Sequence, residues 1–472
     1  MKLNYSTLAF SIVAMVLGTG RSYAQEGYAP MGYPYPTGNP APYDPAGMQQ
    51  PGMMPPGMQA GYAPPAMMGA PGAMPYAQMA AAPGGGTMTP GMQYAGMDPA
   101  SMYEPAGDYV QYENVAGMPC DDCGDGCALP PRAYGTFDAM MVWRKGGNYP
   151  AILTTSDPAD LGVLGQPSTQ VLFGAGNETD GPSIGGRITL GLWLDDYQNW
   201  SVGGRFMALE EQSLGYTATS AQYPTLAYPF FNTNTMMQDS NLVALPTSPN
   251  FANSTVNIEN RNSIYMGDFF VTKHIYTNHG NRWDFVTGYS YAKIEDNLYN
   301  NASFEVVAAG GSGFTNGDIV AYNDAFEATN EFHGGQFGLI AEFQDGPLSW
   351  RAMGKISVGN MRQEATINGS RTINGTPVAG GGVYALPSNI GSYDRDQFAY
   401  IPEANVEMLY ALNCNLDFKI GATFIYFSDV VTGGTMINTN IDPSFGGTDP
   451  TFQFLEQEYW VLGMTLGVDY HY

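Results

Sequence analysis

The sequence predicts an all-β protein, a transmembrane antiparallel up-and-down β-barrel of about 10–12 strands preceded by a disordered low-complexity arm. Three observations support this fold class. Segments of nine to eleven residues alternate apolar with small or polar side chains, which is the period-2 pattern of a strand. Charged residues make up only 13% of the chain, while aromatic residues reach 13%. The 60 Gly and 34 Pro disfavour long helices.

The chain begins with the features of a secretory signal, which we expect to span residues 1–24. Lys2 precedes the apolar run LAFSIVAMVL, and Ala24 ends a small-residue cleavage site. This run is too short to cross a bilayer as a helix. We therefore expect an exported protein whose mature chain has no transmembrane helix.

Residues 25–132 form the predicted arm, which is built mainly from Pro, Gly, Ala, Met, Tyr and Gln, with recurring AGM and PGM triplets. Few branched aliphatic side chains are available to offset the entropy of ordering, so we expect disorder. The Met thioethers could capture a soft metal such as Cu(I). A linker that threads the periplasm or contacts the cell wall is the favoured interpretation.

The arm ends in a cysteine cluster, CDDCGDGC, which contains Cys120, Cys123 and Cys127. The remaining cysteine, Cys414, lies in a predicted turn. A structural zinc site needs four ligands in paired spacings, and three clustered cysteines do not supply them. In an exported protein we expect disulfides within the cluster or to another chain, and no metal or other cofactor.

Residues 133–472 contain ten alternating segments and form the predicted barrel. The segments start near residues 134, 184, 200, 263, 282, 332, 349, 403, 416 and 459. The stretches 300–323 and 361–374 would raise the number to twelve. Short turns (DDYQN, NHGN, QDGP and NCN) alternate with long connections such as 211–262 and 359–400, as expected for periplasmic turns and outer loops.

A soluble β-sandwich is the alternative architecture. Its strands usually have five or six residues, and its outer face carries Lys and Glu. Here the face opposite the apolar one carries Gly, Thr, Ser and Asn with scattered charges, which suits a water-filled or lightly plugged lumen. Trp and Tyr near the segment ends are typical of an interfacial girdle. Open sheet edges cannot lie in lipid, so the sheet is expected to close.

The chain ends in YWVLGMTLGVDYHY, where the alternation continues to the last residue. Closure requires this segment to pair with the first strand, near 134–143. Its ending on an aromatic residue also resembles the signal that the bacterial barrel-assembly machinery reads. That machinery and outer-membrane lipid are therefore the expected partners. The residues assigned to the lipid face and the assembly signal are Trp460, Leu462, Leu466, Val468, Tyr470 and Tyr472.

The sequence does not predict an enzyme. It has only four His, and no nucleophile motif such as G-x-S-x-G accompanies them. His333 shares a face with Phe337 and Leu339, which places it near the lipid interface. The phrases GGQFG and GAGN lack the Lys and the strand-to-helix switch of a phosphate loop. A net charge of −26 excludes nucleic acid as a partner.

Several phrases occur together in one order: WRKGGNYPAILTTS, LGVLGQPSTQVLFG, GGRITLGLWLDD, RWDFVTGYSYAKIEDNL, NEFHGGQFGLIAEF, KISVGNMRQEATINGS and IPEANVEMLYAL. Through them, residues from about 133 to 472 resemble a bacterial outer-membrane family catalogued as putative beta-barrel porin 7. The resemblance implies a β-barrel in the outer membrane and does not cover the arm.

Two functions are compatible with such a barrel. The function that we expect is a porin-like channel for passive passage of small hydrophilic solutes, whose opposed lumen charges create a transverse field. The same charges could instead pair and plug the barrel. The second is a non-conducting anchor that acts in the envelope through its arm and acidic loops. The lumen-charge candidates are Arg187, Arg205, Arg282, Asp284, Arg351, Lys355, Glu403, Glu407, Asp417 and Lys419.

Overall fold

The computed structural model describes residues 131–145, 147–178, 181–278, 280–444 and 447–472, all within one compact unit. The predicted signal, nearly all of the arm and the cysteine cluster lie outside the described residues. Strands dominate the described part, which also contains a short 3-10 helix, η3 (Gly434–Met436). Within these ranges no helix has the length and apolarity needed to span a membrane.

Ten strands form a closed antiparallel ring. The first strand, β1, and the last, β18, pair from Tyr134–His471 to Arg144–Val461, so the sheet closes between the two predicted partners. Closure leaves no strand edge of this ring to be covered in lipid. In spatial order the strands are β1 (Ala133–Arg144), β6 (Ser183–Trp193), β7 (Trp200–Thr219), β10 (Asn250–Asn278), β11 (Asn281–Ala308), β12 (Ile319–Asp345), β13 (Leu348–Ile373), β15 (Gly391–Asn413), β16 (Leu416–Val430) and β18 (Gln457–His471).

Each predicted segment coincides with one of these strands, but most strands are longer than predicted. β10 to β13 contain 26–29 residues each. The stretches 300–323 and 361–374 are ends of β11, β12 and β13, so the suggestion of two further ring strands was wrong. The long connections predicted at 211–262 and 359–400 are in large part strand, because β7, β10, β13 and β15 extend into them.

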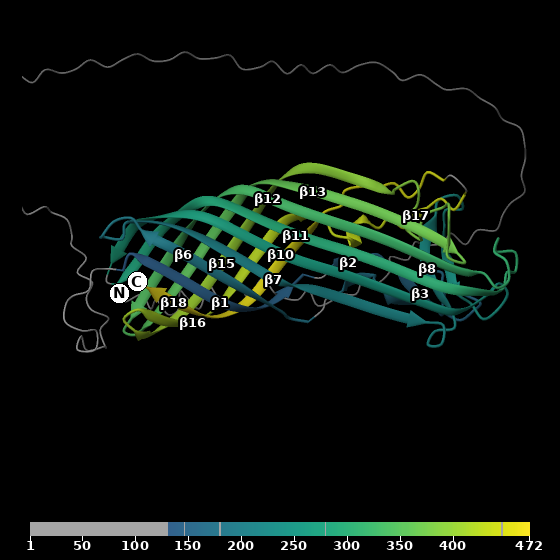
Figure 1. Cartoon of the computed structure of the whole chain (residues 1–472), viewed down its shortest axis with the longest axis horizontal. Helices are drawn as coiled ribbons and strands as arrows, with labels where there is room; N and C mark the ends of the chain where they lie inside the picture. The colour runs from purple at the N-terminus through teal and green to yellow at the C-terminus, as the bar shows by residue number, and fades with distance from the viewer. Residues whose placement is uncertain (1–130, 146, 179–180, 279, 445–446) are drawn as a thin grey trace, which may run out of the picture. The chain divides into compact units, whose positions relative to one another are not determined.

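Four tight turns gather at one end of the ring, together with the end of β18; this short-turn end lies on the left in Figure 1. Longer connections lie at the opposite, distal end. β17, β8, β3 and β4 form a small sheet there, to which β9 is added through β8. The short strands of the connections are β2 (Gly147–Tyr149), β3 (Leu153–Thr155), β4 (Gln170–Phe173), β5 (Gly176–Glu178), β8 (Leu226–Asn232), β9 (Met237–Ala244), β14 (Thr376–Val378) and β17 (Asn440–Ile441).

The outer face of the barrel changes character along the long strands. Toward the short-turn end its side chains are apolar and exposed, such as Phe285 on β11 and Leu339 on β12. Further along the same faces come Glu295, Glu327 and Asn323, with no change in the alternation. A strand of about 9–11 residues is enough to cross a bilayer. The strands therefore leave the lipid and continue for more than ten residues on its far side.

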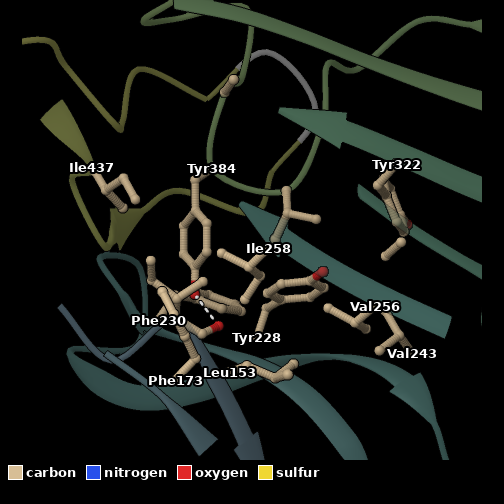
Figure 2. Close-up of a cluster of buried hydrophobic side chains, with 14 of the residues drawn as sticks. Leu153, Phe173, Tyr228, Phe230, Val243, Val256, Ile258, Tyr322, Tyr384 and Ile437 are labelled. Carbon is tan, nitrogen blue, oxygen red and sulfur yellow. Dashed lines mark hydrogen bonds between the residues drawn. The ribbon is translucent and has the colours of Figure 1, made fainter. Parts of the chain in front are cut away.

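The interior changes in the opposite sense and becomes a packed apolar core at the distal end. Figure 2 shows Tyr228 and Phe230 of β8 gathered with Ile258 of β10 and with Tyr384. The Tyr384 hydroxyl donates to the backbone carbonyls of Ile152 and Pro229, at 3.1 and 3.0 Å. The distal half of the barrel is thus built like a soluble β-protein, with polar side chains outside and an apolar core inside.

Candidate functional site

Ten charged side chains of opposite sign meet inside the ring, and we call them the lumen ion layer. Five are cations and five are carboxylates, so their charges cancel although the whole chain carries −26. The acidic excess of the protein must therefore lie outside this layer. The members are Arg187, Arg205, Arg351, Lys355 and Lys419, with Asp138, Asp268, Glu403, Glu407 and Asp469.

One half of the layer is centred on Arg187 of β6. Its guanidinium donates to Asp138 at 2.8 Å and to Glu407 at 2.7 Å. The Lys419 ammonium lies 2.9 Å from Asp138 and 3.4 Å from Glu407. Each carboxylate is therefore shared by two cations. These side chains are almost fully buried, with Asp138 at 0% exposure, so the mutual pairing compensates the loss of hydration.

Gly467 of β18 makes the contact between Asp138 and Lys419 sterically feasible. It is the register partner of both residues, one on each neighbouring strand. A Cβ atom at this position would lie 2.2 Å from the Asp138 carboxylate and 2.4 Å from the backbone oxygen of Phe137. A glycine lets the ion pair form across β18.

The other half of the layer bridges the barrel diameter. Arg205 of β7 and Glu403 of β15 are five strands apart in a ring of ten, so they start from opposite walls. The Arg205 guanidinium nevertheless donates to Glu403 at 2.6 Å and to Asp268 at 2.7 Å. Lys355 contacts Asp268 at 2.9 Å and Glu403 at 3.2 Å. This contact therefore spans the lumen from wall to wall at this level.

Arg351 of β13 completes the layer. Its guanidinium donates to Asp469 of β18 at 2.7 Å and lies 3.9 Å from Glu407. It also contacts Glu342 at 3.3 Å. The ten members of the layer therefore come from eight of the ten ring strands.

An apolar layer fills the barrel directly beyond the ions, toward the distal end. Its side chains share the inward alternation of the ion layer, as Met140 does with Asp138 and Ile401 with Glu403. They pack as one cluster: Met140, Val142, Met207, Leu209, Ile264, Met266, Ala292, Ile294, Phe332, Met361, Ala399, Ile401, Ile425, Phe427, Val430, Tyr459 and Val461. A lumen packed with apolar side chains excludes water and hydrated solutes.

The chain after β16 then folds into the barrel. Val431 donates its N–H to the Asn330 side chain at 2.9 Å, and the Asn330 amide donates back to the Val431 carbonyl at 2.8 Å. The Gly433 N–H donates to Asp296 at 2.8 Å. Asn330 and Asp296 belong to β12 and β11, on the wall facing β16. Residues 431–437 therefore cross the interior. Burial at this place raises the pKa of the Asp296 carboxyl.

A second internal segment is fixed at the distal end by Asp324 of β12. Its carboxylate accepts the N–H groups of Val383 at 2.9 Å and Ala385 at 3.2 Å, and the Asn300 amide at 3.0 Å. Burial raises the pKa of Asp324 to about 6. Buried side chains thus fill the interior at successive levels from the ion layer to the distal core.

Seven of the ten lumen-charge candidates belong to the ion layer, and the other three lie at the short-turn end. Arg282 donates to Asp284 at 2.8 Å, and Asp284 lies 3.0 Å from His274. Asp417 lies 3.3 Å from His471. These three side chains therefore pair locally near the turns and take no part in the ion layer. In the residues that the structure describes, no cluster of potential ligands is arranged to hold a metal ion.

Three members of the ion layer were not among the candidates: Asp138, Asp268 and Asp469. Asp138 and Asp469 stand on the small or polar faces of the first and last predicted strands, so their alternation was a usable signal. Asp268 lies in the predicted segment that starts near residue 263, where it shares its alternation with the apolar Ile264 and Met266. Which cation each would meet depends on register and ring order, which one strand's sequence does not contain.

Other predicted residues are placed as follows. His333 is on the outer face, where its Nδ1 lies 2.5 Å from the Tyr289 hydroxyl. Leu466, Val468 and Tyr470 are exposed on the outer face of β18, where Trp460 and Leu462 share their alternation. Tyr472 is exposed directly after the end of the strand. Cys414 lies in the turn between β15 and β16 and is disulfide-bonded.

Comparison with solved structures returns matches of low identity. Solved structures similar to this chain include the outer membrane protease OmpT from Escherichia coli, at 10% identity and a TM-score of 0.36, covering 74% of this chain and 99% of that one. A FadL homologue from Pseudomonas aeruginosa has 7% identity and a TM-score of 0.21, with 72% and 90% covered. The toluene transporter TodX from Pseudomonas putida has 9% identity and a TM-score of 0.19, and the match covers 73% of this chain and 90% of that one.

Because these TM-scores are all below 0.5, the matched structures carry no argument about this chain. The search among curated proteins found no match. The family model described as Putative beta barrel porin-7 (BBP7), in contrast, matches residues 134–472, which is the whole ring with its connections. The chain therefore belongs to the Putative beta barrel porin-7 family of bacterial outer-membrane β-barrels.

Proposed function

We propose that this protein is a closed, non-conducting barrel that anchors surface and periplasmic segments in the outer membrane. The observation that carries the proposal is the Arg205–Glu403 contact between opposite walls, backed by the apolar layer beyond it. The resting barrel passes no hydrophilic solute. The proposal assigns no catalytic activity to the chain.

The energetics favour a closed resting state. Separating a buried ion pair from its partner costs about 3–5 kcal/mol, because a buried charge is then left uncompensated. Opening the lumen would disrupt several such contacts together and would also hydrate the apolar layer. Thermal fluctuations of that size are rare, so a passive flow of solute through the barrel is not expected.

The working parts are then the two ends of the barrel. In outer-membrane barrels the short turns face the periplasm and the long connections face outward. The distal barrel would stand above the outer leaflet as a rigid, polar-surfaced projection. The arm, which precedes β1, would leave from the periplasmic side, where it can reach the cell wall.

A passive channel for small hydrophilic solutes is the second candidate. Two observations favour it: the inner faces near the short-turn end are strongly polar, and the family is named for porins. This function would require the ion layer and the apolar layer to rearrange together.

Solute uptake by proteoliposomes separates the two functions. With folded wild-type protein, we expect swelling in an isotonic pentose solution to be no faster than in protein-free liposomes. Arg205→Ala with Glu403→Ala removes one cation and one anion from the ion layer, and the remaining apolar layer should keep this variant closed. The exposed pair Arg261→Ala with Glu259→Ala is the matched control. If wild-type protein causes swelling whose rate falls with increasing solute size, the anchor function is contradicted and the channel function is supported.

A further inference from the structure

We propose that the distal edge of β15, residues 392–398, binds a basic, extended segment of a partner protein by β-strand addition. The pairing of β15 with β16 stops at Glu403–Ile425, whereas its pairing with β13 continues to Gly391–Ile367. Along this stretch β15 therefore has a paired side and a free edge. The inference goes beyond the anchor function and does not depend on a closed lumen.

Pro402 explains why the pairing with β16 stops. The Ala411 N–H donates to the carbonyl of Pro347, which precedes β13, so odd-numbered residues of β15 point their backbone groups toward β13. Even-numbered residues point theirs toward β16, as the Tyr400 N–H does in donating to the Ser428 hydroxyl at 3.1 Å. Pro402 stands at an even position and has no N–H to give to that ladder.

Four backbone N–H groups beyond Pro402 remain free for a further strand. Within the described part of the chain, no hydrogen-bond partner is found for the N–H of Ser392, Asp394, Asp396 or Phe398. The same four residues are exposed, so water reaches this edge. A row of free donors and acceptors along an extended strand is a template for one more strand.

The free edge lies outside the lipid. Across the sheet, Asp394 is level with Glu364 of β13, which is level with Thr329 of β12 and through it with Glu295 of β11. Glu295 belongs to the polar outer face of the distal half of the barrel. A partner therefore reaches the edge from the aqueous side of the membrane.

The inner side of the edge strand is fixed before a partner binds. Residues 451–456 lie against it: the Phe452 ring stacks on Tyr393 with centroids 4.1 Å apart, and Glu456 pairs with Arg395. Among the described residues, no hydrogen bond joins the backbone of this segment to that of β15. The segment therefore supports the edge without occupying its ladder, and a preformed edge lowers the ordering cost of binding.

Charge decides which occupant fits the edge. Asp394 and Asp396 project outward at alternate positions, about 7 Å apart along the strand. The cations at adjacent positions, Arg362 and Arg395, are paired with other carboxylates. Two copies of this edge would repel each other, whereas a strand with Lys or Arg at every second position would place its charges opposite the two aspartates. The exposed Phe398 adds an apolar contact at one end.

A seven-residue peptide tests the docking on the full-length protein in lipid nanodiscs. The probe is fluorescein-labelled Val-Thr-Lys-Thr-Lys-Thr-Val, whose lysines face the two aspartates and point their N–H groups toward β15 in an antiparallel strand. Fluorescence anisotropy should show saturable binding. N-methylation of both lysine amides should abolish it, and N-methylation of two threonine amides, which face away, should not. No binding of the probe, or equal binding of the two methylated peptides, would overturn the proposal.

Variants of the edge separate its charge from its backbone groups. Asp394→Asn with Asp396→Asn should weaken binding about tenfold. Glu295→Gln with Glu327→Gln removes the same charge from the outer face of β11 and β12 and should change nothing. Asp394→Pro also removes one free N–H, so this variant should bind far more weakly than Asp394→Asn, with folding verified by heat-modifiable migration.

Two other outcomes of these measurements would contradict the proposed occupant. Equal weakening by both double variants would mean a general attraction of the peptide to an acidic surface. A dimer of the full-length protein that Asp394→Pro separates into monomers would identify a second copy as the occupant. Either result would overturn the proposal.

Discussion

At the scale of single residues, the ion pairs inside the barrel depend on positions without a side chain as well as on the charged residues themselves. Asp138 and Lys419 come from strands on either side of β18, and they meet only because Gly467 has no side chain. Glycines on the inner face are easily interpreted as room for solute. At this position the room is used by an ion pair.

Gly467→Ala should destabilise the folded barrel by about 1–3 kcal/mol, because the new methyl group would collide with the Asp138 carboxylate and with the Phe137 backbone. Urea unfolding in detergent measures the loss. Gly354→Ala is the control, since a Cβ there meets nothing within 4 Å. Equal stability of the two variants would show that the ion pair does not depend on this glycine.

Asp324 gives the distal barrel a predictable pH dependence. Burial raises the pKa of its carboxyl from 3.8 to about 6 in the folded state. Between about pH 6 and pH 4 the folded protein therefore binds a proton that the unfolded chain does not. Protonation of Asp324 therefore raises the free energy of unfolding as the pH falls through this window. That contribution is lost again as the pH rises.

Relative to Asp324→Asn, which cannot titrate, wild-type protein should gain about 2 kcal/mol of unfolding free energy between pH 7 and pH 4. Urea unfolding at both pH values measures the difference, and other titrating groups cancel in the comparison. Identical pH profiles for the two proteins would contradict a raised pKa at Asp324.

At the scale of elements, β10 to β13 combine a membrane strand and a soluble strand in one continuous run. The sequence located all ten ring strands because their lipid-facing halves alternate clearly, as in RWDFVTGYSYA. It missed their distal halves because outward Asn, Glu and Ser in phrases such as EDNLYNNAS are typical of loops. Burial of Leu298 and Phe304 against the returning connections, which local sequence does not encode, makes them strands.

Two substitutions on the outer face of β12 should separate the halves. Leu339→Arg lies in the apolar band and should cost about 2–4 kcal/mol, while Asn323→Arg on the same face of the distal half should cost little. Folding yield and urea unfolding in lipid bilayers measure both. Similar costs at the two positions would place them in the same medium and contradict the division of the strand.

At the scale of the whole molecule, closure of the ring and closure of the lumen are separate matters. The terminal alternation predicted that β18 would pair with β1, and the register confirms it. Seven lumen candidates were identified as charged inner-face residues, but only ring order brings Arg205 and Glu403 together from opposite walls. A one-dimensional pattern shows which face a charge occupies and not which partner it meets.

Deletion of Tyr470 to Tyr472 should lower the outer-membrane yield of folded protein by an order of magnitude or more. The deletion removes the hydrogen bonds of Tyr472 to Arg132 and Ala133 and the aromatic end of the last strand. Heat-modifiable migration of membrane extracts measures the yield. Tyr472→Phe keeps the backbone pairing and the aromatic side chain, so this variant should assemble normally. Unchanged assembly of the deletion variant would show that the terminal segment is not needed for assembly.

Single-channel recording in planar bilayers tests the central claim, a closed lumen, most directly. Wild-type protein whose folding is verified by heat-modifiable migration should insert without any steady conductance above the bare bilayer at neutral pH. The ion layer and the apolar layer should keep it silent over long recordings. Uniform, stepwise conductance from the same folded sample would show an open passage and contradict the closed barrel.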